Sequence, residues 1–334
     1  MAHDNIKGKV IFIVGPTAVG KTAVAIQLAK ALKTEVISAD SMQIYRHMDI
    51  GTAKPSLEEM SSVPHHMIDI VEPWEYFSAG QYLQRVSGII AELHHRGLIP
   101  IITGGTGLYM KALTRGLFTS PPADLTFRAE LLQKEKGSPG YLLQSLKEID
   151  PVAASRIAPN DHRRLIRALE VYHRTKRPIS HLQAQETVSL DYDYIKIGIT
   201  RPRQELYEII NRRVDAMIEK GLIEEVKGVI ETILNHSPCP TNKHELEHLF
   251  SFTSMQAIGY KEIARSIYGE IDLDRAITLI KQRTRNYAKR QFTWFRDEED
   301  IVWIEHSALL RDFGQILKGC NSDEIKNAWP CKTL

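Results

Sequence analysis

The residues with the clearest chemistry form a phosphate-binding pattern near the N-terminus. Residues 15–22 match G-x-x-x-x-G-K-[ST] in full. Glycines at this spacing let backbone amides curve around phosphate oxygens, and the start of a helix adds positive potential. The lysine can bridge two phosphates, and the final hydroxyl can bind Mg²⁺. The pattern predicts a site for a phosphate-rich small molecule at Gly15, Pro16, Thr17, Ala18, Val19, Gly20, Lys21 and Thr22, with Thr22 as the Mg²⁺ ligand.

Two more polar segments follow predicted strands. Asp40 comes just after residues 35–38, and Thr106 lies in a glycine-rich turn after residues 99–103. In an open parallel sheet, ligands bind outside the carboxyl ends of the strands, so both segments should face the phosphate site. A carboxylate at Asp40 could accept a proton or hold Mg²⁺ through water, but it could also cap a helix. The glycine-rich segment could be only a tight turn.

The elements that must position these segments alternate between strand and helix. Apolar runs predict strands at 9–14, 35–38, 99–103 and 194–200. Helical patterns occupy 22–32, 81–95, 108–113, 204–220 and 274–294. This alternation predicts an α/β fold, a P-loop NTPase-like parallel sheet flanked by helices.

A change in composition near Pro121 and Pro122 marks a second region. Residues 124–181 carry only helical patterns, rich in Leu, Arg, Lys and Glu. We therefore predict an α/β core with C-terminal helices at 1–122 and 194–315, an all-helical insertion domain at 123–193, and a weakly structured tail at 316–334.

The bulk composition excludes several classes of protein. The chain has 334 residues, of which 43% are hydrophobic and 25% charged, with a net charge of +2. These values are ordinary for a soluble globular protein. Its three cysteines have neither the number nor the spacing for a disulfide framework or a zinc site, so we expect a cytoplasmic protein. There is no signal peptide pattern, and we expect no membrane association. The adjacent histidines at 65–66 and 94–95 point in different directions, so we interpret them as surface or packing residues.

The phosphate pattern alone does not identify its ligand. No apolar strand ends in the Asp-Glu pair of a motor ATPase, and residues 241–244 lack the aspartate of a guanine-reading motif. Nucleotide hydrolysis is therefore poorly supported. The remaining possibilities are phosphoryl transfer or displacement of diphosphate.

Several blocks together resemble the bacterial tRNA dimethylallyltransferases, also called tRNA isopentenyltransferases. The blocks are residues 15–22, 40–45, 49–55, 104–109, 161–170, 257–262 and 289–296. The resemblance implies transfer of a dimethylallyl group from its diphosphate to N6 of adenosine-37 in the tRNA anticodon stem-loop, beside adenosine-36. It also implies that the P-loop holds dimethylallyl diphosphate with Mg²⁺, that Lys21 and Thr106 assist catalysis, and that Asp40 is the general base.

The same resemblance implies a surface for tRNA. Asp40, Ser41, Met42, Gln43, Thr106 and Arg128 match family positions near the RNA. Basic residues on predicted helices extend this set, since phosphate contacts require such clusters. They are Arg163, Arg164, Arg167, Lys289 and Arg290. Any single arginine could instead lie on a solvated helix face. No zinc-finger spacing of cysteines and histidines follows Arg296, so the chain resembles the shorter bacterial form of the family. We also expect a monomer.

Three other functions remain open on the residues alone. One is a small-molecule kinase that uses ATP on the same P-loop, which would need no arginine-rich insertion. Another is an RNA-binding protein without catalysis, for which replacement of Asp40 should leave function intact. The third is prenylation of free adenine nucleotides, which the insertion and the basic C-terminal helix disfavour.

Overall fold

The computed structural model describes residues 8–118, 121–187, 189–241, 244–309 and 314. These residues form two compact units. The first, here called the sheet unit, contains the described residues up to Met110 and from Asp191 onward, and the second, the helical unit, is Lys111–Leu190. The first boundary was predicted at residue 122. In the structure it lies between Met110 and Lys111, inside helix α4 (Gly107–Arg115). The predicted tail, 316–334, lies outside the described residues.

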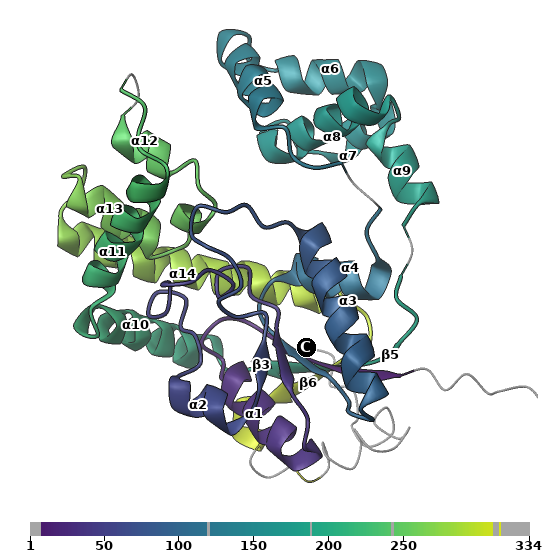
Figure 1. The fold of residues 1–334 in the computed structure, drawn as a ribbon, viewed down its shortest axis with the longest axis vertical. Helices are drawn as coiled ribbons and strands as arrows, with labels where there is room; N and C mark the ends of the chain where they lie inside the picture. Colours follow the sequence, from purple (N-terminus) through teal and green to yellow (C-terminus); the bar gives the residue numbers. More distant parts are fainter. Residues whose placement is uncertain (1–7, 119–120, 188, 242–243, 310–313, 315–334) are drawn as a thin grey trace, which may run out of the picture. The chain divides into compact units, whose positions relative to one another are not determined.

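A six-stranded parallel sheet is the centre of the sheet unit (Figure 1). Its order is β3-β2-β4-β1-β5-β6. The strands are β1 (Lys9–Val14), β2 (Val36–Ser38), β3 (His65–His66), β4 (Ile101–Thr103), β5 (Asp193–Thr200) and β6 (Ile301–Glu305). The central strand β1 is buried from Val10 to Val14, as expected for a parallel strand covered on both faces. The predicted P-loop-like α/β fold is confirmed.

Helices pack around this sheet, with α10, α11, α13 and α14 grouped together (Figure 1). The helices of the sheet unit are α1 (Lys21–Leu32), α2 (Leu57–Ser62), α3 (Ala79–His95), α10 (Arg203–Glu219), α11 (Leu222–His236), α12 (Glu245–Leu249), the short 3₁₀ helix η1 (Ser254–Gln256), α13 (Tyr260–Ile267) and α14 (Leu273–Arg296). Local sequence fixes several of their starts. For example, Ser78 and Gln81 form a reciprocal capping box at α3.

The histidine pairs have structural contacts. His66 Nε2 lies 2.6 Å from a carboxylate oxygen of Glu35, and Arg96 contacts the other oxygen. His94 Nε2 lies 2.9 Å from the carbonyl oxygen of Lys9. No group of three potential metal-binding side chains occurs in the part of the chain that the structure describes. These contacts agree with the interpretation of the histidines as packing residues.

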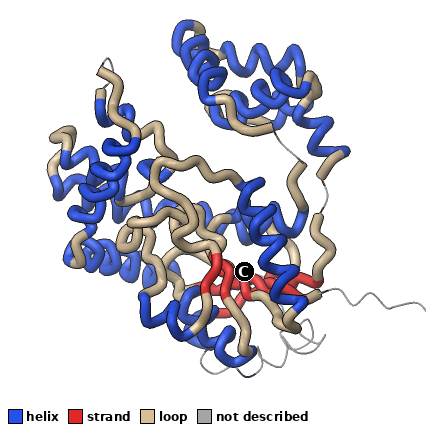
Figure 2. Tube along the Cα trace, viewed as in Figure 1, coloured by secondary structure: helices blue, strands red, loops and turns tan. Residues whose placement is uncertain are grey.

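Helices and loops make up the described part of the helical unit (Figure 2). Besides part of α4, its helices are α5 (Leu125–Gly137), α6 (Tyr141–Ile149), α7 (Pro151–Arg156), α8 (His162–Thr175) and α9 (Ile179–Gln185). Leu142, Leu146 and Leu165 are fully buried in a core of its own. The prediction of an all-helical insertion is confirmed. Across the described residues of both units, no helix is long and apolar enough to cross a membrane.

Candidate active site

The P-loop connects β1 to α1 at the carboxyl edge of the sheet. Two of its positions require glycine. Gly15 has φ 138°, and a Cβ there would lie 2.4 Å from the carbonyl oxygen of Ile199. Gly20 caps α1 with φ 106°. Side chains are strained in this left-handed region, so both glycines are needed for the loop to curve into the helix. Thr22 follows in the first turn of α1.

Lys21 lies in a buried, charged environment. Its Nζ donates a 2.8 Å hydrogen bond to the carbonyl oxygen of Pro16, which directs the ammonium back over the loop. Burial lowers the pKa of Lys21 to about 8, the charge of Asp40 opposes this shift, and Arg213 adds to it. Lys21, Asp40 and Arg213 therefore form a cluster of two cations and one carboxylate.

Arg213, from α10, is absent from the predicted site. Burial lowers its pKa, and the charge of Asp40 partly offsets that effect. A buried cation beside a P-loop is suited to a second anionic group of a ligand. Its only signal in the sequence is a double arginine within a predicted helix, a pattern that does not reveal which side chain faces the interior.

Asp40 holds a turn through one carboxylate oxygen and leaves the other oxygen available. Its Oδ1 accepts hydrogen bonds from the amides of Met42, at 2.8 Å, and Gln43, at 3.4 Å. The backbone after Asp40 is a turn, not a helix. The alternative interpretation of Asp40 as a helix cap is therefore wrong, because its carboxylate holds a turn and no helix follows. No donor among the described residues contacts Oδ2, so that oxygen can accept a proton.

Thr106 connects the second and third strand ends. Its Oγ1 accepts a 3.1 Å hydrogen bond from the amide of Ser41, and its own amide donates to the carbonyl oxygen of Ala39 at 3.1 Å. The structure thus brings Thr106 next to Ser41 and so close to Asp40, although Thr106 follows Ser41 by 65 residues in the sequence.

Gln291 of α14 contacts the site and is absent from the predicted set of site residues. It is only 5% exposed. Its Oε1 accepts a 2.8 Å hydrogen bond from the amide of Thr17, and its Nε2 donates a 3.0 Å bond to the carbonyl oxygen of Gly105. Gln291 therefore holds the P-loop and the β4 turn at the same time.

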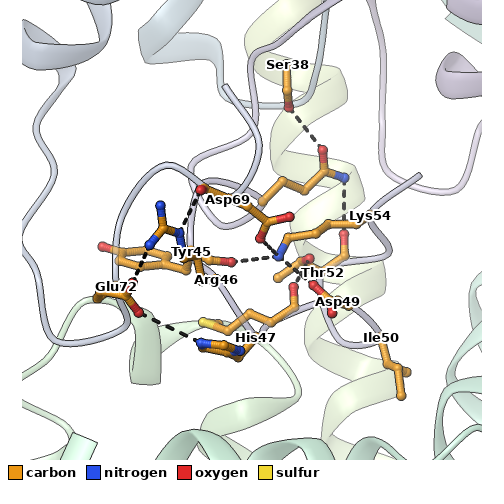
Figure 3. Close-up of polar contacts among 12 residues, drawn as sticks. Ser38, Tyr45, Arg46, His47, Asp49, Ile50, Thr52, Lys54, Asp69 and Glu72 are labelled. Carbon is orange, nitrogen blue, oxygen red and sulfur yellow. Dashed lines mark hydrogen bonds and ion pairs between the residues drawn. The ribbon is translucent and has the colours of Figure 1, made fainter. Parts of the chain in front are cut away.

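The predicted RNA-contacting segment after β2 rests on an internal polar network (Figure 3). The carbonyl oxygen of the Gln43 amide accepts a 3.0 Å bond from Ser38 Oγ. Its nitrogen donates to the carbonyl oxygens of Thr52 and Ala53, at 3.3 and 3.2 Å. The amide group of Gln43 is thus occupied by protein contacts. This arrangement fixes the turn that carries Asp40, Ser41 and Met42.

Lys54 is the centre of the same network (Figure 3). Its side chain is 3% exposed, and Nζ donates to the carbonyl oxygen of Tyr45 at 2.7 Å. The ammonium also contacts the carboxylates of Asp49, at 2.6 Å, and Asp69, at 2.5 Å. A buried ammonium is stable only with such partners, so Lys54 has a structural role here.

Glu225 of α11 holds the loop that precedes Lys54. Its carboxylate accepts hydrogen bonds from three consecutive amides, those of Asp49, Ile50 and Gly51, at 2.9, 2.7 and 2.9 Å. The Tyr260 hydroxyl also donates to Glu225. A carboxylate can accept this many bonds because both oxygens carry two lone pairs. The loop is thereby fixed to the helices behind it.

The predicted basic residues of the helical unit fall into two groups. Arg128 makes two hydrogen bonds to the fully buried Glu170, at 2.7 and 2.8 Å, and Arg167 pairs with the same carboxylate. Arg163 and Arg164, in contrast, are exposed on α8. The first pair orders the unit and still adds positive charge, whereas the second pair is open to solvent.

Lys289 and Arg290 lie exposed on α14 in the sheet unit. They border an open hollow of about 490 Å³, together with Asn286, Thr293, Trp294 and Asp297. The guanidinium of Arg290 lies 5.8 Å from the ring centroid of Tyr287, a cation–π distance. Their RNA contacts stay a prediction.

A P-loop at the carboxyl edge of a parallel sheet, with a carboxylate and two cations facing it, defines a P-loop-like α/β protein with an anion site. Comparison with known proteins makes this more specific. The chain matches the family described as IPP transferase over residues 43–298, and it belongs to that family.

Named relatives and solved structures cover nearly the whole chain. A tRNA dimethylallyltransferase of Thermodesulfovibrio yellowstonii is 52% identical over 302 residues, or 90% of this chain and 93% of that protein. One from Symbiobacterium thermophilum is 42% identical and covers 98% of both chains. The full-length tRNA isopentenylpyrophosphate transferase of Bacillus halodurans has a TM-score of 0.67 and 40% identity, covering 96% of this chain and 99% of that one. A eukaryotic dimethylallyltransferase acting on tRNA has a TM-score of 0.77 and 29% identity, covering 98% and 81%.

Proposed function

We propose that this protein transfers a dimethylallyl group from dimethylallyl diphosphate to N6 of adenosine-37 in tRNA and releases diphosphate. The observation that carries this proposal is the electrostatic interaction of the buried Lys21 ammonium of the P-loop with the carboxylate of Asp40. It puts an anion site for a leaving group beside a carboxylate that can accept a proton. Family membership and the names of the relatives support the same reaction.

The P-loop side acts on the leaving group. When the allylic C–O bond breaks, its electron pair stays on the diphosphate oxygen and negative charge grows there. Lys21, Arg213 and the loop amides stabilise that charge. Oxygen donors such as the Thr22 hydroxyl and the phosphates fit Mg²⁺, which would add further charge neutralisation when bound.

The Asp40 side acts on the nucleophile. The lone pair of adenine N6 is delocalised into the ring, so the amine attacks carbon poorly while it keeps both protons. The N6 lone pair forms the new C–N bond, and Oδ2 of Asp40 accepts the proton that N6 loses. Thr106, hydrogen bonded to the amide of Ser41, orders the surface on which the base lies.

The tRNA must present an extruded base, because N6 is not reachable inside a stacked loop. In this proposal Met42 and its neighbours contact that base, and exposed arginines and lysines bind phosphates. The helical unit supplies Arg163 and Arg164, and α14 supplies Lys289 and Arg290. We further propose that the protein acts as a monomer in the cytoplasm, where tRNA is modified.

A transfer assay distinguishes this function from the ATP-dependent kinase. The protein is incubated with Mg²⁺, labelled dimethylallyl diphosphate and unmodified tRNA that has adenosines at positions 36 to 38. We expect label in the tRNA and no requirement for ATP. Absence of transfer together with consumption of ATP would reject the proposal in favour of the kinase. Replacing the tRNA by free adenine nucleotides tests the third alternative.

A further inference from the structure

Arg201 contacts the P-loop from the end of the neighbouring strand. Strand β5 pairs with β1 in parallel, with Gly198 opposite Val14, so the residues after Gly198 lie beside the loop. The Nε of Arg201 donates a 3.1 Å hydrogen bond to the carbonyl oxygen of Val19. The Arg201 side chain is 17% exposed, and it also pairs with Glu205. A planar guanidinium held by two partners is a well-ordered donor.

This hydrogen bond sets the direction of the next amide of the loop. No cis peptide bond occurs among the described residues, and a planar trans peptide has its carbonyl and N–H on opposite sides. Because the Val19 carbonyl faces Arg201, the N–H of Gly20 points away from Arg201. Within the part of the chain that the structure describes, nothing accepts from this N–H. The Gly20 amide is therefore available to an anion in the loop.

The peptide between Pro16 and Thr17 is different, because the protein uses both of its ends. Its carbonyl accepts a 2.8 Å hydrogen bond from Lys21 Nζ, and its N–H donates a 2.8 Å bond to Gln291 Oε1. That peptide has no donor left for a ligand. The peptide held by Arg201, in contrast, has its carbonyl occupied and its N–H available.

The glycine at position 20 makes the orientation of this peptide easy to reverse. Reversal changes ψ of Val19 and φ of Gly20, and glycine accepts φ of either sign. The observed φ of Gly20 is 106°. In the reversed state the Val19 carbonyl would face a bound anion and repel it, and the Gly20 N–H would face the Arg201 guanidinium, which cannot accept a hydrogen bond. Arg201 therefore favours the orientation that suits an anion.

We propose that Arg201 is a positioning residue for the diphosphate site, because it holds the Val19 carbonyl and so turns the Gly20 amide toward the phosphate. It acts through the loop and not by touching the ligand. The identity of the ligand, the diphosphate of the prenyl donor, rests on the proposed function. The contacts between Arg201 and the loop do not.

The first test measures binding of Mg²⁺-diphosphate by calorimetry, without any transfer reaction. Arg201→Met removes the hydrogen bond and the charge, whereas Arg201→Lys keeps the charge but has a methylene where Nε lies. We expect the Kd to rise about tenfold in both variants, the effect of about one hydrogen bond to an anion. Arg212→Met, which removes an exposed arginine of α10, is the matched control and should keep the Kd within about twofold, because exposed charges are screened. Wild-type affinity in Arg201→Lys would show that only the charge matters and would overturn the proposal.

The second test observes the Gly20 amide itself by NMR. Only Gly15 and Gly20 follow a valine in this sequence, so labelling valine carbonyls with ¹³C and glycine nitrogens with ¹⁵N selects these two amides. The signal that disappears in Val14→Ile belongs to Gly15. We expect saturating Mg²⁺-diphosphate to move the Gly20 amide proton downfield in the wild type, as a hydrogen bond to an anion does, and much less in Arg201→Met.

Equal movement of the Gly20 signal in both proteins would contradict the proposed role of Arg201. Melting temperatures show whether the variants are folded, and Arg201→Lys takes the place of Arg201→Met in the NMR test if the latter is unfolded. If the wild type binds diphosphate with an Arg201-dependent Gly20 signal but transfers nothing to tRNA, the proposed function fails and the role of Arg201 stands.

Discussion

Lys21 and Asp40 follow two different strands, β1 and β2, yet the charge of Asp40 acts on the Lys21 ammonium across the crevice. The carboxylate raises the pKa of the ammonium, against the larger lowering by burial. The same carboxylate raises the pKa of Arg213. The single negative charge of Asp40 therefore partly offsets the two buried positive charges before any ligand binds. Loss of that balance should affect both the anion site and the proton acceptor.

Asp40→Asn should abolish transfer and spare tRNA binding. Asparagine keeps an oxygen that can accept from the Met42 amide, so the turn persists. It cannot accept the N6 proton, and loss of a general base typically costs about 10²–10⁴-fold in rate. Single-turnover transfer and filter binding of tRNA measure the two properties separately. Wild-type transfer by this variant would exclude Asp40 as the base.

Binding of diphosphate should weaken as the pH rises through about 8, where the buried Lys21 loses its proton. Below that pH the ammonium is charged and attracts the anion. Above it, each pH unit removes up to about 1.4 kcal/mol of that attraction. Calorimetry of Mg²⁺-diphosphate at several pH values tests this. Lys21→Arg is the comparison, because a guanidinium stays charged and should flatten the profile.

The same shift predicts the sign of a stability effect. Burial favours the neutral form of Lys21 in the folded protein, whereas the unfolded chain keeps the proton up to its ordinary pKa of 10.5. The unfolded state binds more protons between about 8 and 10.5, so this residue's contribution to stability increases with pH in that window. Urea unfolding of wild type and Lys21→Met at pH 7 and 9.5 measures it. The unfolding free energy of wild type, relative to that of Lys21→Met, should be larger at pH 9.5 than at pH 7. An equal or smaller relative value at pH 9.5 would show that the pKa of Lys21 is not lowered.

Glu225→Ala should destabilise the protein and weaken tRNA use. The change leaves the amides of Asp49, Ile50 and Gly51 without their acceptor, at a cost of about 2 kcal/mol. The KM for tRNA should rise because Gln43 is bonded to the same loop. Glu224→Ala is a matched control, since Glu224 is exposed on the same helix. Equal unfolding free energies of the two variants would show that Glu225 does not hold the loop.

The helical unit should depend on Glu170 and on acid pH. Burial raises the pKa of Glu170. The hydrogen bonds from Arg128, the Asp124 amide and Arg167 lower it by more, so the net pKa lies below the ordinary value of 4.5. Its stabilising contribution is thus present above pH 4.5 and is lost as the pH falls through the lower, folded-state pKa. Glu170→Gln should remove this acid dependence and lower stability at pH 7 by about 2–3 kcal/mol. Circular dichroism of both proteins across pH 3 to 7 is the measurement.

Local patterns predicted the parts of the site that lie within one strand–turn–helix segment. The apolar run at residues 9–14 and the glycine pattern after it predicted β1 and the P-loop, because both are determined by neighbouring residues. Strand ends likewise predicted Asp40 and Thr106. Two strands were missed. β3 has only two residues, His65–His66, and no apolar run, whereas β6 (Ile301–Glu305) is an apolar run that the prediction left out.

Arg213 and Gln291 could not be predicted in this way. Each is one polar residue among several on a helix, and periodicity does not identify which loop that helix face will meet. The Gln291–Thr17 contact joins residues 274 positions apart. Conversely, the family resemblance implied RNA contacts for Gln43 and Arg128, whose polar atoms make internal contacts with Thr52 and Glu170. Those internal partners could not be predicted from the resemblance.

The most direct test of the central claim is to locate the transferred group. Two tRNAs that differ only at position 37, one with adenosine and one with guanosine, are incubated with Mg²⁺ and dimethylallyl diphosphate. They are then digested to nucleosides and analysed by mass spectrometry. The account predicts a dimethylallyl adenosine from position 37 of the first tRNA, none from the second, and none from either with Asp40→Asn. Transfer to the guanosine-37 tRNA, or to adenosines elsewhere in the loop, would contradict it.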